Sequence, residues 1–208
     1  MFALHFSSVY SSTRLNTNLE SLNLPFFDLP IAADFSAENV LLKLTALRGI
    51  TSVGPDGIPG DFIYQLRQVI SFPLWLLFRH SLDEGVFPAI WKISHITPIL
   101  KSGDTSDIKN YRPISILSHL SKTFESLVLD SIMPSLNPVL IDEQHGFRLG
   151  RSTETCNITF TKFIYDAFKC GSQVDVIYTD FTKAFDSVNH EVLVSVLEAL
   201  GFGYPFLG

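Results

Sequence analysis

Residues 174–179 combine β-branched and aromatic side chains, and a carboxylate, Asp180, follows them. This composition predicts a strand over Val174–Phe181. A helix is predicted before it, over Thr155–Lys169 with Gly171 as its stop, and helical spacing of apolar residues predicts another after it, over Asn189–Leu200. A rigid strand that carries one carboxylate at its tip can hold a hard cation against a phosphate. The chain must therefore form a mixed fold, whose class we predict as α+β.

Turn residues and apolar spacing divide the rest of the chain into further elements. Ser36 and Gly49 are typical of the two ends of a helix. Pro59 is typical of the first turn of a second helix, whose buried face is predicted to hold Phe62, Ile63, Leu66, Val69 and Ile70. The other expected elements are a turn over Ser52–Pro59, a helix over Pro73–Glu84, a hairpin of Trp91–Lys101 with Tyr111–Ile116, a helix over Ser115–Ile132 and a loop over Asp142–Thr153.

Composition indicates a globular protein with a substantial core. The chain has 208 residues, of which 46% are hydrophobic and 18 are Phe, an aromatic content that does not fit a disordered tail. Residues 1–34, where Phe2, Phe6 and Tyr10 allow one short helix, are expected to be a poorly defined lead-in. Residues 35–208 are expected to form the domain. The longest apolar run, Phe72–Phe78, is far shorter than the roughly 18 residues that span a bilayer.

Charge and cysteine content bear on location and partners. Met1 is not followed by a basic start and an apolar stretch, so we expect an intracellular protein, in nucleus or cytoplasm, that is neither secreted nor bound to a membrane. The two cysteines, Cys156 and Cys170, fit ordinary thiols in a reducing compartment. The net charge of −6 is unusual for a nucleic-acid-binding protein, although residues 91–151 are relatively basic.

Four segments, taken together and in order, resemble the reverse transcriptase domain of non-LTR retrotransposons, the LINE-like elements. They are SVGPDGIP (52–59), KSGDTSDIKNYRPISIL (101–117), EQHGFRLGRST (143–153) and DVIYTDFTKAFD (175–186). The resemblance covers roughly residue 35 to the C-terminus. It implies the fingers and the first half of the palm of a right-hand polymerase, truncated before the Asp-Asp hairpin. A group II intron maturase or a telomerase relative is a more distant alternative.

The resemblance implies that Asp180 is the first catalytic aspartate. Nucleotide addition in the family uses two divalent cations, and Asp180 with the Phe181 carbonyl would be ligands for Mg²⁺. Phe185 would lie under the sugar of the incoming nucleotide and exclude a 2′-hydroxyl, while Phe181 would also adjoin the nucleotide. The structural alternatives are an Asp that caps a turn, a core Phe at position 185 and, for Asp186, a cap of the following helix.

Further roles concern nucleotide and template. Lys101 and Arg112, on the expected hairpin, would close on the triphosphate of the dNTP. A second set would face the template: Gln144, Gly146, Phe147, Arg148 and Arg151. The alternatives are ordinary surface cations at 101 and 112. His145 is interpreted as a hydrogen-bonded structural residue, and Asp56 as a turn residue.

The chain departs from the family pattern in one respect that matters for chemistry. No Asp-Asp pair occurs in its 208 residues, and one carboxylate does not hold two magnesium ions at working strength. We therefore expect a fragment of an RNA-directed DNA polymerase that is inactive alone, whereas the full-length parent would use RNA template, DNA primer, dNTP and Mg²⁺. The oligomeric state stays open.

The alternative function is a non-catalytic RNA-binding or scaffold remnant of a retroelement polymerase. An Asp-Asp hairpin encoded within about 60–100 residues downstream would favour the enzyme. The polymerase interpretation requires Asp180 to lie beside a sheet neighbour and not in solvent.

Overall fold

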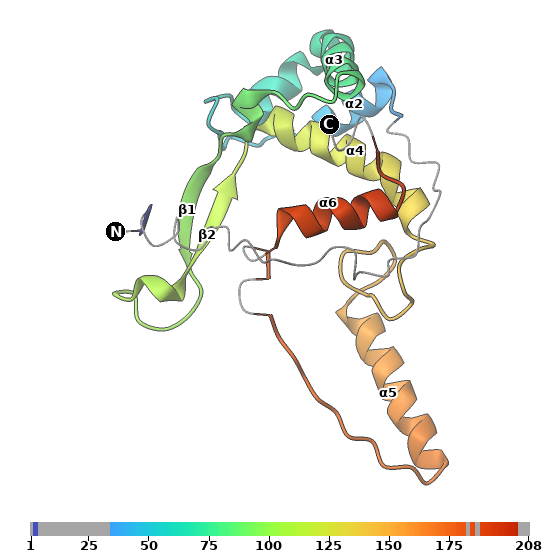
Figure 1. Ribbon diagram of the computed structural model, residues 1–208. Helices are drawn as coiled ribbons and strands as arrows, with labels where there is room; N and C mark the ends of the chain where they lie inside the picture. The colour runs from blue at the N-terminus through green and yellow to red at the C-terminus, as the bar shows by residue number, and fades with distance from the viewer. Residues whose placement is uncertain (1, 4–33, 182–183, 186–187, 204–208) are drawn as a thin grey trace. The chain divides into compact units, whose positions relative to one another are not determined.

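A computed structural model describes residues 2–3, 34–181, 184–185 and 188–203 of the protein (Figure 1). Its elements are α2 (Ala37–Thr45), α3 (Gly60–Asp83), the 3-10 helix η2 (Ala89–Lys92), β1 (His95–Leu100), the 3-10 helix η3 (Ile108–Asn110), β2 (Tyr111–Ile116), α4 (His119–Leu136), α5 (Thr153–Lys169) and α6 (His190–Ala199). The predicted mixture of helices and strands is confirmed. The helix expected around Phe6 and Tyr10 lies outside the described residues.

The chain divides into two compact units. The first comprises residues 1–133 and 185–208, and the second comprises residues 134–184. The domain boundary expected at residue 34 remains a prediction.

The first unit is built around an aromatic core that α2, α3, η2 and α4 share. Phe78 of α3 is completely buried. Its ring stacks on Phe124 of α4 at a centroid distance of 5.0 Å and meets Trp91 of η2 edge-on at 5.6 Å. The remaining buried members of the cluster are Phe35, Val40, Leu44, Ile63, Leu82 and Leu127. Apolar residues from four elements thus close one core.

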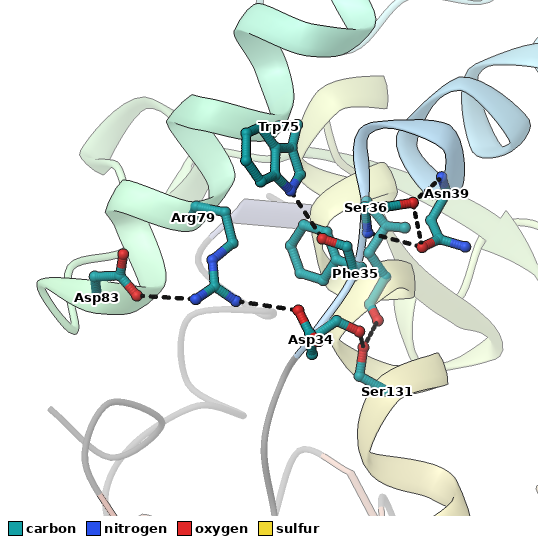
Figure 2. A network of polar contacts seen from close by, with 9 residues as sticks. Asp34, Phe35, Ser36, Asn39, Trp75, Arg79, Asp83 and Ser131 are labelled. Atoms are coloured by element: carbon teal, nitrogen blue, oxygen red, sulfur yellow. Dashed lines mark hydrogen bonds and ion pairs between the residues drawn. The ribbon is translucent and has the colours of Figure 1, made fainter.

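A polar network fixes the chain where it enters α2 (Figure 2). Ser36 caps α2 and forms a reciprocal capping box with Asn39, as the sequence predicted for the start of this helix. The indole N–H of Trp75 in α3 donates to the carbonyl of Phe35 at 2.8 Å. Ser131 of α4 donates to the carbonyl of Asp34 at 3.2 Å. The segment before α2 is therefore tied to both α3 and α4.

The two helices predicted on either side of Phe72 form one continuous helix, α3, with Pro73 inside it. A proline in a helix interior costs roughly 3 kcal/mol. We attribute the continuity to core packing at both ends of α3, through Ile63 on one side and Phe78 on the other. The predicted buried face was partly wrong, because Phe62, Leu66 and Val69 are exposed.

The helix predicted over Ser115–Ile132 is displaced towards the C-terminus and runs over His119–Leu136, through Pro134. Its predicted first residues instead pair in β2, because the ladder with β1 extends to Ile116. Similarly, Trp91 was expected in the hairpin but lies in η2, where burial of its indole ring holds it in the core.

The predicted hairpin is confirmed as a two-stranded antiparallel sheet. Its register places Pro98 directly opposite Pro113. The amide of Lys101 donates to the carbonyl of Asn110 at 2.7 Å, so these two residues form a hydrogen-bonded pair. In an antiparallel ladder, hydrogen-bonded pairs alternate with non-hydrogen-bonded pairs. Three steps along the ladder, Pro98 and Pro113 therefore form a non-hydrogen-bonded pair. Neither proline therefore removes a hydrogen bond from this ladder.

The second unit contains α5 and the segments that flank it. α5 ends at the predicted residue, Lys169, and begins two residues earlier than predicted, at a capping box between Ser152 and Thr155. The strand predicted over Val174–Phe181 is wrong, because these residues form no regular secondary structure. The amino-acid composition of a segment favours a strand only locally, whereas a strand also needs a neighbour that supplies its hydrogen bonds. In the described part of the chain, β1 and β2 pair with each other and with no third strand.

α6 matches its prediction to within one residue at each end. Asn189 caps it by accepting a hydrogen bond from the amide of Val192 at 3.1 Å. Asp186, which was expected to cap this helix, lies outside the described residues. Asn189 fills the N-cap position instead.

Candidate functional site

The turn over residues 52–59 is anchored to the start of α4. Asp56 accepts a hydrogen bond from the amide of Ile58 at 3.1 Å, as expected of a turn residue. Gly54 packs so closely that a Cβ atom there would lie 2.6 Å from the Cα of Ser118. His119 is buried, and its Nε2 lies 2.9 Å from the carbonyl oxygen of Ser52. Sequence reasoning assigned Gly54 only to the turn and missed this contact.

The hairpin brings two of the predicted nucleotide-binding residues together. Lys101 directly follows β1, and Arg112 of β2 lies opposite Ile99. Both residues are exposed. At the tip, Asp104 accepts a hydrogen bond from the amide of Ser106 at 2.9 Å. Hydrogen bonds from the Ser106 backbone and side chain lower the pKa of Asp104, so its carboxylate stays charged at the tip of the hairpin.

The loop between α4 and α5 contains all five residues predicted to face the template. Gln144 donates from Nε2 to the carbonyl of Gly146 at 3.1 Å. Phe147 has a left-handed backbone with φ of 59°, and its side chain is 91% exposed. Position 146 is open, since a Cβ there would meet only the Gln144 side chain, at 3.6 Å. An exposed aromatic ring on an open backbone can pack against a nucleobase.

The two arginines of this loop bond to the loop itself. Arg148 donates to the carbonyls of Ile141, Leu140 and Asn137 at 2.6, 3.4 and 3.1 Å. Arg151 donates to the carbonyl of Asp142 at 3.0 Å and pairs with its carboxylate at 3.2 Å. These bonds within the loop were not expected from the sequence.

His145 is a structural residue, as the sequence indicated. Its side chain is buried, and Nδ1 lies 2.8 Å from Oγ1 of Thr155 in α5. At the same helix end, a hydrogen bond from the Ser152 side chain is the largest of the influences that lower the pKa of Glu154.

The described residues of the motif DVIYTDFTKAFD (175–181, 184 and 185) are exposed and are not gathered into a metal site. Asp180 and Phe181 lie in the irregular segment, and Phe185 is 80% exposed. Across residues 34–181 and 188–203, no three His, Cys, Asp or Glu side chains are grouped so that they could hold a metal ion. The described residues therefore do not fit a two-magnesium centre. The requirement that Asp180 lie beside a sheet neighbour is not met.

Two hollows in the first unit lie away from these residues. A groove of about 550 Å³ runs between the end of α3 and α4, and a smaller hollow of about 240 Å³ lies between α2 and α4. None of the predicted site residues lines either one. Lys101, Arg112, Gln144, Gly146, Phe147, Asp180, Phe181 and Phe185 are exposed, whereas Arg148 and Arg151 are half-buried.

Comparison with known families decides the class of this protein. The family model described as reverse transcriptase (RNA-dependent DNA polymerase) matches residues 99–206, more than half of the chain. The chain belongs to the reverse transcriptase family. The match begins within β1 and includes the loop between α4 and α5 and the DVIYTDFTKAFD stretch. The recognition made from the sequence is confirmed, and the requirement placed on Asp180 was too strict.

Individual relatives agree with this membership. The chain is 33% identical to the probable RNA-directed DNA polymerase from transposon BS of Drosophila melanogaster, over 91% of this chain and 21% of the relative. It is 30% identical to the RNA-directed DNA polymerases from mobile element jockey of Drosophila melanogaster, over 84% of this chain and 19% of the relative, and of Drosophila funebris, over 87% and 20%. This reverse transcriptase sequence thus spans about a fifth of each relative's length. No helix among its described residues is long and apolar enough to cross a membrane.

Proposed function

We propose that this chain supplies the fingers and the first half of the palm of an RNA-directed DNA polymerase. The family match over residues 99–206 carries the proposal. It includes the part of the hairpin that carries Lys101 and Arg112, the loop with Gln144, Gly146 and Phe147, and the segment with Asp180. In this proposal the hairpin cations meet phosphate, and the loop meets the RNA template. Phe181 and Phe185 adjoin the incoming nucleotide, and DNA primer is the second strand.

Chemistry at Asp180 is part of the same proposal. A lone carboxylate can supply one ligand to magnesium, which prefers several oxygens in an octahedron. The described residues offer no group that completes the set. We therefore propose that Asp180 contributes to a magnesium site only together with carboxylates beyond this chain, and that the chain alone does not extend a primer.

A second candidate is a non-catalytic RNA-binding or scaffold module. The observation that favours it is the exposed Asp180 carboxylate, which the described residues do not group with further metal-binding side chains. Both candidates predict that this chain alone does not extend a primer, and they differ in whether the full-length parent does. An Asp-Asp hairpin encoded downstream of this segment would favour the polymerase over the non-catalytic module.

We expect no template-dependent product when the 208-residue chain is supplied with an RNA template, a DNA primer, magnesium and all four dNTPs. The physical reason is the incomplete ligand set around Asp180. Asp180→Asn, which removes the charge at nearly constant size, is expected to behave identically. Primer extension resolved on a denaturing gel gives the answer. Product that appears with the natural chain and disappears with Asp180→Asn would refute the proposed inactivity and assign Asp180 to the chemistry.

Removing both hairpin cations, as Lys101→Ala with Arg112→Ala, is expected to weaken binding of single-stranded RNA. The slope of log affinity against log salt should fall by about 0.7 for each phosphate that the variant no longer neutralises. Fluorescence anisotropy with a labelled RNA oligonucleotide measures both quantities. The control removes equal charge elsewhere: Lys162→Ala, from the pair with Asp166 on α5, with Arg67→Ala, from its stack on Tyr64. Equal weakening in the two double variants would mean that only net charge matters.

A further inference from the structure

The loop over residues 137–151 is held in shape by the guanidinium group of Arg148. Three of its five N–H donors are committed to backbone carbonyls, at Asn137, Leu140 and Ile141. These carbonyls lie just beyond the last residue of α4, Leu136. The Ile141 carbonyl also accepts from the amide of Gln144 at 3.1 Å. Arg148 thus ties together three backbone carbonyls of the segment that follows α4.

The other end of the loop is fixed at α5 through Thr155. Its hydroxyl donates to the carbonyl of Ser152 at 2.9 Å and accepts from the amide of Ser152 at 2.8 Å. Because the single hydroxyl hydrogen is used, Nδ1 of the buried His145 is the donor in its 2.8 Å contact with Thr155. The loop is therefore pinned at both ends, after α4 by Arg148 and at α5 by His145.

Between these two anchors the backbone takes up a strained conformation. Phe147 has φ of 59°, which is uncommon for an aromatic residue and persists only where the surroundings impose it. The side chains on either side of Arg148 point out of the loop: Phe147 is 91% exposed and Leu149 is 94% exposed. Because Arg148 bonds within the loop while Phe147 and Leu149 are exposed, the loop offers an RNA template these two apolar side chains and not the guanidinium group.

We infer that Arg148 is a positioning residue, which sets the loop backbone and does not serve as a ligand for template phosphate. Its contribution to RNA binding then comes from the shape of the loop and not from its charge. The inference rests on the proposed function for the role of the loop, and it revises the phosphate contact that the sequence suggested for Arg148. Arg151 bonds to the backbone and carboxylate of Asp142 in the same manner.

The test compares Arg148→Lys, which keeps the charge but loses the planar fork, with Arg148→Gln, which loses both. Amide hydrogen exchange is measured in the free 208-residue protein. We expect both variants to raise exchange across residues 137–151 by about ten-fold or more, the factor that corresponds to losing a hydrogen bond to a charged group. Arg112→Gln, on the hairpin, should leave exchange in the loop unchanged. Unchanged exchange in both Arg148 variants would overturn the inference.

RNA binding supplies the second readout, with a labelled single-stranded oligonucleotide of mixed sequence. A positioning role predicts that Arg148→Lys weakens binding as much as Arg148→Gln, while the salt slope stays at that of the natural chain. A phosphate ligand predicts the reverse: Lys restores binding, and Gln lowers the slope by about 0.7. If the natural chain binds no RNA, the proposed function fails, and the exchange experiment still decides whether Arg148 holds the loop.

Discussion

Replacing Phe78 with alanine is expected to lower the free energy of unfolding by about 3–5 kcal/mol, the usual cost of truncating a buried aromatic residue. Phe78 is completely buried and contacts rings from three other parts of the chain: Phe35 at 6.5 Å, Trp91 at 5.6 Å and Phe124 at 5.0 Å between centroids. The cavity left by the ring would open where these elements meet, and none of them can close it without moving away from the others.

The chain offers a matched control on the same helix and a probe in the same unit. Phe62 of α3 is 57% exposed, so Phe62→Ala should change the free energy of unfolding by far less. The protein has two tryptophans, Trp75 and Trp91, and both pack against this core. A urea titration followed by tryptophan fluorescence therefore reports on this unit. Equal destabilisation of the two variants would contradict the packing described for Phe78.

Gly54→Ala is expected to cost about 1–3 kcal/mol, the range for forcing atoms into a packed site. The added Cβ would lie 2.6 Å from the Cα of Ser118, 2.7 Å from the carbonyl oxygen of Leu117 and 2.9 Å from the amide nitrogen of Ser118. All three are backbone atoms at the start of α4, so no side-chain rotation relieves the overlap. The turn over residues 52–59 would have to separate from α4, breaking the contact of His119 with Ser52.

The same fluorescence titration measures this destabilisation, and Gly203→Ala serves as the control. A Cβ at Gly203 would meet nothing within 4 Å, so this variant should unfold at nearly the same urea concentration as the natural chain. A Gly54→Ala protein as stable as Gly203→Ala would show that the turn does not pack against α4 as described.

Helices and strands could be predicted from the sequence where residues close together in the chain determine the local structure. Ser36 placed the start of α2 correctly, and the expected stop at Gly171 placed the end of α5 at Lys169. The end of α2 was misplaced, because the helix ends at Thr45, four residues before Gly49. The hairpin was predictable because two β-rich stretches flank one polar turn. Prediction failed where distant packing decides the outcome, as at Pro73, whose helix continues because both of its ends join the core.

The candidate site shows the same division between local and distant information. Motif order identified the family, because motifs are written in the sequence itself. The inward bonds of Arg148 to Asn137 and Ile141 could not be anticipated, since they depend on how the chain folds back after α4. The 174–181 segment has strand composition, but no strand beside it within the described residues.

The opposed prolines of the hairpin bear on how this protein behaves in concentrated solution. In a non-hydrogen-bonded pair of an antiparallel sheet, the backbone nitrogen of each residue points away from the partner strand, towards the open edge of the sheet. Pro98 and Pro113 therefore leave a gap in the donor row on each flank of the ribbon, and a third strand from another molecule finds no amide there. Residues 174–181 contain no proline, so self-association of this protein should begin at that segment and spare the hairpin.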